Sequence, residues 1–311
     1  MENNKKSSNG VLKAILAGAI LAFIVGVLVL VSGVLHRGES GTESQPVAES
    51  VAESTAEESL ETSVSANEIA VTSIPENPDA SKEESAQESV PEPEGNGIIV
   101  CIDPGHETEQ IKEMEPNAPG SDVMKQGVTS GTYGETSGKY EYEVNLEVSL
   151  KLKDILKERG YEVVMTREIN DVKISNVERA KLATEAGADI LVRIHCNGVD
   201  NHDVTGVLCY GPSYANPYLP EEVIKRSVRL CEILQQSQAA ATGQRVIENL
   251  YEDNMTGINW ATMPVSIVEM GFMTNPDEDL YLASEEGQKA IAEGLANGID
   301  AYFAEYPKTM E

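Results

Sequence analysis

Lysine and arginine are scarce in this chain of 311 residues. There are 23 of them against 52 aspartates and glutamates, which gives a formal net charge of −29. A protein that binds nucleic acid needs a basic patch on its surface. Nothing in this charge balance suggests such a patch, so we do not expect nucleic acid as a partner.

Cysteine is also scarce, with four residues at positions 101, 196, 209 and 231. Their spacings match no dense disulfide framework of the kind found in small secreted domains. Three of the four lie in apolar segments, where a free cysteine behaves as a small hydrophobic residue. We therefore expect buried free thiols.

Charged side chains are missing from residues 14–35, which form an almost wholly apolar run. The run is long enough to cross a bilayer as a helix, and no clear small-residue cleavage site marks it as a signal peptide. Lys5, Lys6 and Lys13 precede it, so the positive-inside rule places residues 1–13 in the cytoplasm. We expect a single-pass protein of the cell membrane with its functional part outside the cytoplasm.

Aromatic residues are absent from residues 38–96, which carry fifteen acidic residues against the single Lys82. Such a composition cannot bury enough apolar surface to fold, and its charges repel one another. We predict that residues 36–96 form a disordered linker. Residues 97–306 then have the size of one domain with a proper core, followed by a short tail, 307–311.

Within this domain, apolar runs typical of buried strands alternate with the apolar periodicity of helices. Alternation of this kind predicts an α/β sheet with parallel strand pairs and right-handed crossovers. Residues 107–140 are rich in Gly, Ser, Thr and Pro, which predicts a long surface loop with a functional role. The predicted strands are 97–103, 161–166, 189–194, 204–210 and 264–268, and the predicted helices are 141–159, 176–185, 221–241 and 285–303.

Two of the four histidines follow predicted strands. His106 comes after the first strand in "CIDPGH", and His195 ends the third in "ILVRIHCNG". Ligands of open α/β sheets bind at the carboxyl ends of the strands. Imidazole is a common zinc ligand, and a catalytic zinc needs a third protein ligand. Glu141 at the start of a predicted helix is the best-placed carboxylate, and Glu143 competes with it on position alone.

A further carboxylate, Glu269, ends the apolar strand of "PVSIVEMGFMTN". If it faces the metal, it can take a proton from an attacking water and return it to a leaving amine. Cys196 offers an alternative as the nucleophile of a cysteine hydrolase, with a histidine as its base. Consecutive strand residues point to opposite faces, however, so Cys196 and His195 should diverge.

The chain resembles a known family in four segments that occur in the family's order. It is similar to the zinc-dependent N-acetylmuramoyl-L-alanine amidases, the Amidase_3 family of bacterial cell-wall hydrolases, over about residues 98–303. The resemblance implies a mixed, largely parallel sheet of about six strands flanked by helices, Zn²⁺ as the cofactor and peptidoglycan as the substrate. The segments are "IVCIDPGH", "EYEVNLEVSLKLKDILKERGYEVVMTR", "ILVRIHCNG" and "MPVSIVEMGFMTNPDED".

The resemblance also implies roles for individual residues. His106, Glu141 and His195 would hold the zinc, with Glu141 preferred because the family's ligand stands four residues before an Asn-Leu pair. Glu269 would be the catalytic carboxylate. The implied reaction is hydrolysis, by a zinc-activated water, of the amide that joins the lactyl group of N-acetylmuramic acid to L-alanine.

One departure from the family's usual pattern stands out. Glu107 follows "DPGH" where glycine is common, and the connection to Glu141 is thirty-four residues long. We interpret this connection as a substrate-groove or lid loop. Asn197 and Trp260 are candidate substrate contacts, although a turn explains Asn197 equally well and core packing is the default interpretation of Trp260.

Two functions of different classes are compatible with these observations. One is a membrane-anchored amidase, and the other is a non-catalytic or partner-activated domain that binds peptidoglycan on the same fold. The presence of Glu269 favours the enzyme, because a binding module has no need of a general base. Which protein partner it has, if any, is not indicated.

Overall fold

The computed structural model describes residues 95–308. The predicted membrane span 14–35 and nearly all of the predicted linker 36–96 lie outside these residues. Between residues 95 and 308, no helix combines the length and the apolar character that crossing a membrane requires.

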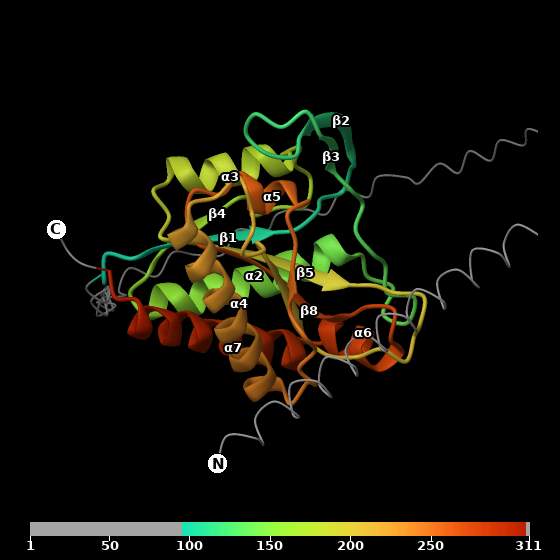
Figure 1. Cartoon of the computed structure of the whole chain (residues 1–311). Coiled ribbons are helices and arrows are strands. Elements are labelled where there is room, and N and C mark those ends of the chain that lie inside the picture. Colours follow the sequence, from blue (N-terminus) through green and yellow to red (C-terminus); the bar gives the residue numbers. More distant parts are fainter. Residues whose placement is uncertain (1–94, 309–311) are drawn as a thin grey trace, which may run out of the picture. The chain divides into compact units, whose positions relative to one another are not determined.

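A six-stranded sheet forms the centre of the domain (Figure 1), which confirms the expected mixed, largely parallel sheet flanked by helices. Strands β4, β1, β5 and β8 are parallel to one another, β6 runs antiparallel to β8, and β7 is parallel to β6. The strands, in sheet order, are β4 (Glu162–Met165), β1 (Ile99–Pro104), β5 (Ile190–Asn197), β8 (Val265–Phe272), β6 (Leu208–Gly211) and β7 (Leu250–Tyr251).

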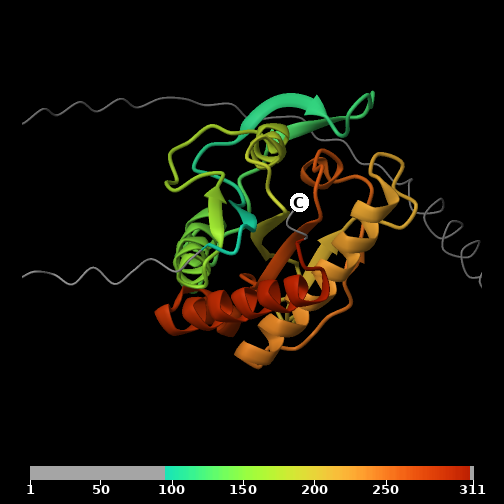
Figure 2. The same cartoon turned by 90° about the vertical axis from the view of Figure 1, so that its left-hand side faces the viewer.

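Helices cover both faces of the sheet, and the two layers differ in thickness (Figures 1 and 2). Below the sheet in Figure 1 lie α2 (Glu141–Glu158), α4 (Glu221–Thr242) and α7 (Glu285–Glu305). Above it lie α3 (Asn176–Glu185) and the short α5 (Thr256–Asn259). The larger apolar cluster of the core lies between the sheet and the α2, α4 and α7 layer, and a smaller one lies under α3 and α5.

The segment between β1 and α2 is more regular than the sequence predicted. Instead of an unstructured loop, residues 107–140 contain an antiparallel hairpin of β2 (Ile111–Pro116) and β3 (Met124–Val128). That part of the prediction was wrong because these strands, "IKEMEP" and "MKQGV", are largely polar and so lack the apolar alternation of a core strand. The hairpin lies above α3 in Figure 1.

Three short elements were also not predicted: α5, β7 and α6 (Pro276–Ala283). Local signals for α6 are present, since Asn275 caps it by accepting hydrogen bonds from two backbone amides and Pro276 occupies its first turn. The prediction for cysteine is confirmed, because all four are buried and unpaired.

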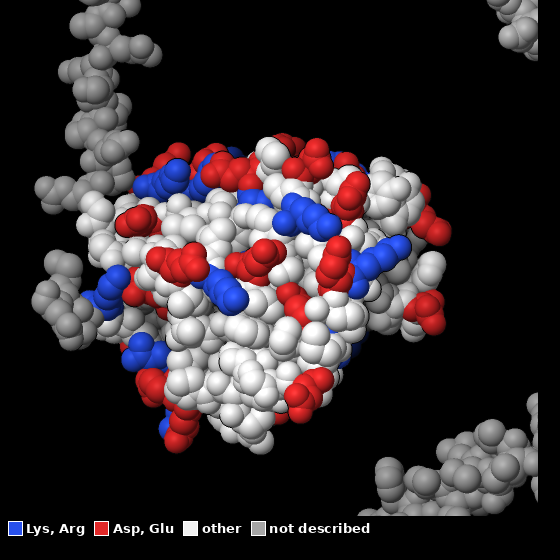
Figure 3. All heavy atoms as spheres, turned by 90° about the horizontal axis from the view of Figure 1, so that it is seen from above, with Lys and Arg blue, Asp and Glu red and all other residues white. Residues whose placement is uncertain are grey.

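Seen from the side of the hairpin and α3, the surface of the domain carries side chains of both charges. Figure 3 shows this face, with Lys and Arg interspersed among Asp and Glu and no continuous basic area. Nothing on the visible face favours nucleic acid, and its exclusion stays a prediction.

Candidate metal centre

Strand register brings His195 and Glu269 side by side. The two residues are direct partners in the parallel pairing of β5 and β8. Partners in neighbouring strands project from the same face of the sheet, so both side chains point toward the α3 and α5 side. Cys196 projects from the other face and packs in the larger apolar cluster, so it diverges from His195 as expected. Burial raises the pKa of its thiol well above the ordinary value.

His106 has an unusual backbone conformation. Its φ of 59° makes it the one non-glycine residue with positive φ between residues 95 and 308. Its carbonyl accepts a hydrogen bond from Arg179 Nη2 at 3.1 Å. The preceding Gly105 donates from its backbone N–H to Ile194 O at 2.9 Å and accepts from Arg167 Nη2 at 3.0 Å. Buried contacts on both sides therefore hold the turn that presents the imidazole.

The second nitrogen of His106 is oriented by the hairpin connection. Nδ1 lies 2.8 Å from the backbone oxygen of Thr129. A carbonyl oxygen can only accept a hydrogen bond, so Nδ1 carries the proton. In the neutral ring Nε2 then has no proton and carries a lone pair. This nitrogen lies 3.2 Å from Glu141 Oε1.

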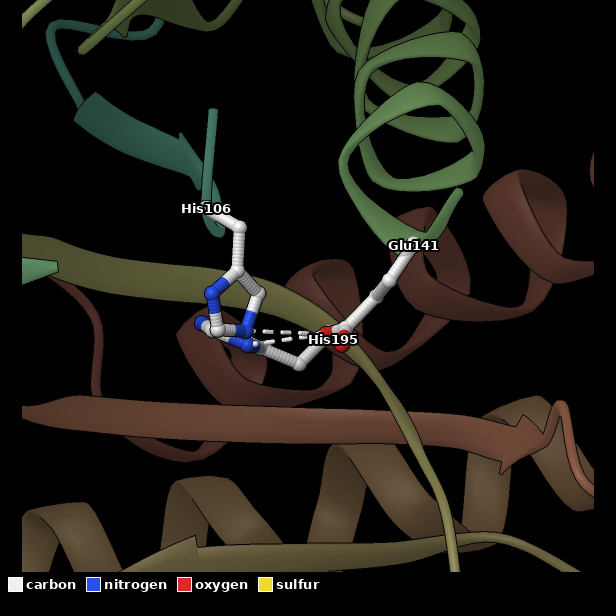
Figure 4. Close-up of side chains that lie close together, drawn as sticks. All are labelled: His106, Glu141 and His195. Atoms are coloured by element: carbon white, nitrogen blue, oxygen red, sulfur yellow. Dashed lines mark hydrogen bonds and ion pairs between the residues drawn. The ribbon is translucent and has the colours of Figure 1, made fainter. Parts of the chain in front are cut away.

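Glu141 lies between the two histidines. Its Oε1 is 3.2 Å from His106 Nε2 and 3.2 Å from His195 Nδ1 (Figure 4). Backbone amides also fix this carboxylate, since Thr132 N–H donates to Oε2 at 2.8 Å and Cys196 N–H donates to Oε1 at 3.0 Å.

Glu143, the competing carboxylate, does not join the cluster. Its Oε2 accepts from Tyr140 N–H at 2.8 Å in the capping box of α2. The structure therefore brings together His106, Glu141 and His195, and it turns Glu143 back toward its own helix.

The electrostatics of the three side chains are coupled. Burial would by itself lower the pKa of His106, but the Glu141 carboxylate outweighs it and raises the value. Burial would likewise raise the pKa of Glu141, yet the two histidines hold it well below its ordinary value. His195 is controlled mainly by burial, which lowers its pKa to about 4. The cluster thus favours an ionised Glu141 carboxylate that is paired with a positive charge beside it.

These residues fit a divalent metal ion. Two imidazoles and a carboxylate are a ligand set of catalytic zinc sites, and their ligand atoms all lie within 4.8 Å of one another. The lone pair of His106 Nε2 faces an anionic oxygen, which is unfavourable unless a proton or a cation lies between them. The buried Nε2 of His195 has no hydrogen-bond partner within the described part of the chain.

Glu269 lines a cavity of about 390 Å³ beside the cluster, together with His106 and His195. Its buried Oε2 has no hydrogen-bond partner among residues 95–308. Burial, and then the negative charge of Glu141, raise the pKa of Glu269 well above its ordinary value. A cation bound nearby would lower the pKa of Glu269.

A network of buried charges below the site was not foreseen from the sequence. Asp103 is fully buried and bonds Arg179 Nη1 and Arg193 Nε, each at 2.6 Å. Glu107, the departure from the family pattern, is also buried and accepts from Arg179 Nη2 at 3.0 Å. Because Arg179 lies 72 residues further along the chain than Glu107, no local pattern could have indicated this pair.

The last part of the connection to Glu141 is fixed by α6. The fully buried Asp279 accepts from the backbone amides of Thr136 and Ser137 at 2.9 and 2.8 Å, and from the Ser137 hydroxyl at 2.6 Å. Gly134 packs so tightly on this carboxylate that a side chain there would overlap it. The segment that leads into Glu141 is therefore anchored to the domain.

Neither of the two candidate substrate contacts lines the cavity of Glu269. Asn197 ends β5, and its side chain accepts from Gly198 N–H at 2.8 Å. Trp260 follows α5 and donates from Nε1 to Pro116 O at 2.8 Å, with the Lys181 ammonium 5.2 Å from its ring centre. Trp260 lines a separate hollow against β2 and α3. Their roles stay predictions.

Comparison with known proteins agrees with this geometry. Residues 100–301 match the model of the Amidase_3 family, described as N-acetylmuramoyl-L-alanine amidase. The uncharacterised protein YqiI of Bacillus subtilis is 34% identical over 178 residues, which cover 57% of this chain and 80% of YqiI. The germination-specific N-acetylmuramoyl-L-alanine amidase of B. subtilis is 25% identical over 225 residues, 68% of this chain and 81% of the relative.

Solved structures show the same relationship. The crystal structure of the N-acetylmuramyl-L-alanine amidase Ami1 from Mycobacterium smegmatis superposes with a TM-score of 0.62 at 25% identity. The match covers 68% of this chain and all of Ami1. An N-acetylmuramoyl-L-alanine amidase from Clostridium difficile 630 superposes with a TM-score of 0.55 at 28% identity, covering 69% of this chain and all of that chain.

Proposed function

The chain belongs to the N-acetylmuramoyl-L-alanine amidase family, and we propose that it cuts peptidoglycan with a zinc ion held by His106, Glu141 and His195. The bond cleaved is the amide between the lactyl group of N-acetylmuramic acid and L-alanine. Membership of the family makes the chain an amidase of peptidoglycan, so a non-catalytic binding domain is not retained. One observation supports the zinc proposal above all: three ligand side chains from separate segments converge beside a buried carboxylate that has no partner among residues 95–308.

When bound, zinc supplies Lewis acidity, which polarises a carbonyl and lowers the pKa of water. The chain's own residues do the rest. Glu269 accepts a proton from the attacking water on its free oxygen and passes it to the nitrogen of the leaving L-alanine. No covalent intermediate with the protein is needed.

Positioning comes from the surrounding backbone. Thr129 O holds the proton on His106 Nδ1, which keeps Nε2 available as a ligand. The amides of Thr132 and Cys196 hold the Glu141 carboxylate in its anionic form. Because these three groups, one acceptor and two donors, belong to the main chain, the ligand geometry is formed before substrate arrives.

The experiment that tests this proposal measures release of new L-alanine amino groups from purified peptidoglycan by the full-length protein. We expect turnover that is lost on zinc chelation, restored by added Zn²⁺, and reduced by about 10² to 10⁴ in Glu269→Gln. Met270→Leu is the matched control, because its side chain lies on the other face of the same strand and packs in the larger apolar cluster. Turnover that survives chelation, or that Glu269→Gln leaves intact, would contradict the proposal.

We further propose that residues 14–35 anchor the protein in the cell membrane with the catalytic domain outside the cytoplasm. The apolar run and the three lysines before it support this topology. The protein should remain in the membrane fraction after a high-salt wash and be degraded by protease added to intact protoplasts. Deletion of residues 14–35 should abolish membrane retention, and retention without that segment would refute the anchor.

A further inference from the structure

The cavity beside the metal centre has one cationic wall. Besides His106, His195 and Glu269, its charged lining residues are Lys125 of β3 and Arg193 of β5. Lys125 is partly exposed and lies opposite Glu115 in the pairing of β2 and β3, but it forms no ion pair among the described residues. Its ammonium is therefore free to meet a ligand that enters the cavity.

Arg193 is the deeper of the two cations, and its side chain is almost fully buried. Nε donates to Asp103 and Nη2 donates to Asn176 Oδ1, each at 2.6 Å. Nη1 lies against Gly257, where a side chain would overlap the guanidinium. The absence of a side chain at Gly257, which itself lines the cavity, leaves room for this close approach.

Arg193 shares its buried carboxylate with a second guanidinium, because Asp103 bridges Arg193 and Arg179. Of the nearby acidic groups, Glu269 lines the same cavity, whereas Glu115 of the hairpin accepts from Val177 N–H at the start of α3 and does not line it. An anionic ligand that enters on the side of Lys125 and Arg193 would form charge-assisted hydrogen bonds with this wall.

The geometry points to a carboxylate subsite formed by Arg193 and Lys125, which binds the peptide side of the substrate. This inference rests on the proposed function, because it takes the adjacent centre as the place where the amide is cut. In the glycan, the carboxyl of the lactyl group is tied up in the scissile amide and the sugars are uncharged. Free carboxylates of a muramoyl-peptide therefore lie on its peptide side, so the cationic wall selects that side.

The test compares two soluble muramoyl-dipeptides that differ in one group. In one, the residue after alanine carries a free α-carboxylate, and in the other this group is an amide, while the side-chain carboxyl is amidated in both. With the full-length, zinc-loaded protein in detergent, we expect the free carboxylate to raise kcat/KM about tenfold, mostly through KM. Lys125→Gln should reduce this preference about threefold.

Arg193→Gln should abolish the preference, and Arg193→Lys should restore part of it if the variant folds with its Asp103 contact. Lys112→Gln is the control, because Lys112 lies on the partner strand of the same hairpin, is exposed and does not line the cavity. Equal kcat/KM values for the two substrates in the wild type would overturn the subsite, as would an equal loss on both substrates in Lys125→Gln.

A binding measurement separates this inference from the proposed function. Calorimetry with the product dipeptide and with its α-amide should show tighter binding of the free carboxylate, and Lys125→Gln should weaken that difference. A binding preference without any turnover would leave the subsite standing and refute the proposed reaction. Turnover with no preference in binding or in kcat/KM would refute the subsite and leave the proposed reaction standing.

Discussion

On the face of the sheet under α2, α4 and α7, strands β1, β5 and β8 present Ile102, Ile194 and Val268 to a large apolar cluster. On the opposite face, neighbouring positions of the same strands carry Asp103, Arg193, His195 and Glu269. The first face buries side chains that need no partners, whereas the second buries charges that do. Toward the carboxyl ends of these strands, a period of two thus separates apolar side chains of the larger cluster from buried charges, while earlier positions on the second face hold the smaller apolar cluster.

The largest effect should come from a change on the polar face that leaves its neighbour untouched. We expect His195→Gln to lower turnover on peptidoglycan by roughly 10³ or more, because losing one of the three proposed metal ligands would remove several kcal/mol of transition-state stabilisation. Cys196→Ala, one residue away on the apolar face, should retain turnover within about twofold. Assays at equal zinc content check both variants. A large loss in Cys196→Ala would instead point to a cysteine nucleophile.

The next largest effect should be a loss of stability when a buried charge on the polar face is removed. Burial alone would raise the pKa of Asp103, but Arg179 and Arg193 hold it below its ordinary value. Asp103→Asn leaves both guanidinium groups without their shared anion and should lower the free energy of unfolding by roughly 4 kcal/mol at pH 7. Urea unfolding of the two proteins measures this difference.

The pH dependence of that difference has a definite sign. A depressed carboxyl pKa contributes stability that is present above the unfolded value, about 3.9, and is lost as the pH falls toward the folded value. The gap between the wild type and Asp103→Asn should therefore narrow below about pH 4. A gap that stays constant down to pH 2 would show that Asp103 does not act through its charge.

A change on the apolar face should affect stability alone. Leu295 of α7 is fully buried in the larger cluster, so Leu295→Ala should cost about 3 kcal/mol of unfolding free energy. Its kcat/KM, measured well below the melting temperature, should match that of the wild type. Loss of activity in a folded Leu295→Ala protein would mean that the two faces are coupled.

The smallest expected effect is at the anchor of the loop. Asp279→Asn removes the charge that holds the amides of Thr136 and Ser137 but keeps an acceptor in place. We expect about 1 to 2 kcal/mol of destabilisation and a loss of up to about tenfold in zinc affinity through the displaced Glu141. Unchanged zinc affinity would show that the segment before α2 does not position its first residue.

The sequence predicted much of this arrangement because the apolar face obeys simple periodicities. The apolar character of residues 97–103, 161–166 and 189–194 predicts strands. β1 and β4 lie within two residues of these bounds, and β5 extends three residues further, to Asn197. The convergence of His106 with His195 also followed from their places at the carboxyl ends of two strands, which proved to be adjacent in the sheet.

The polar face was much harder to predict, since its contacts join residues that are distant in sequence. The hairpin has no apolar alternation, and the partners of Glu107 and Gly134 lie on α3 and α6. Sequence position alone could not separate Glu141 from Glu143. The structure does so because only the first residue of α2 faces the end of β5, while the third folds back to cap the helix.

Gly105 shows how narrow the tolerance of this arrangement is. A methyl group at this position would fall on the imidazole ring of His195. An alanine there would leave every proposed ligand and the proposed general base in the sequence, yet it would displace His195 from the cluster. A search for active relatives that compares only ligand residues would therefore count such a chain as intact. The cluster requires a glycine between Pro104 and His106 as much as it requires the two histidines.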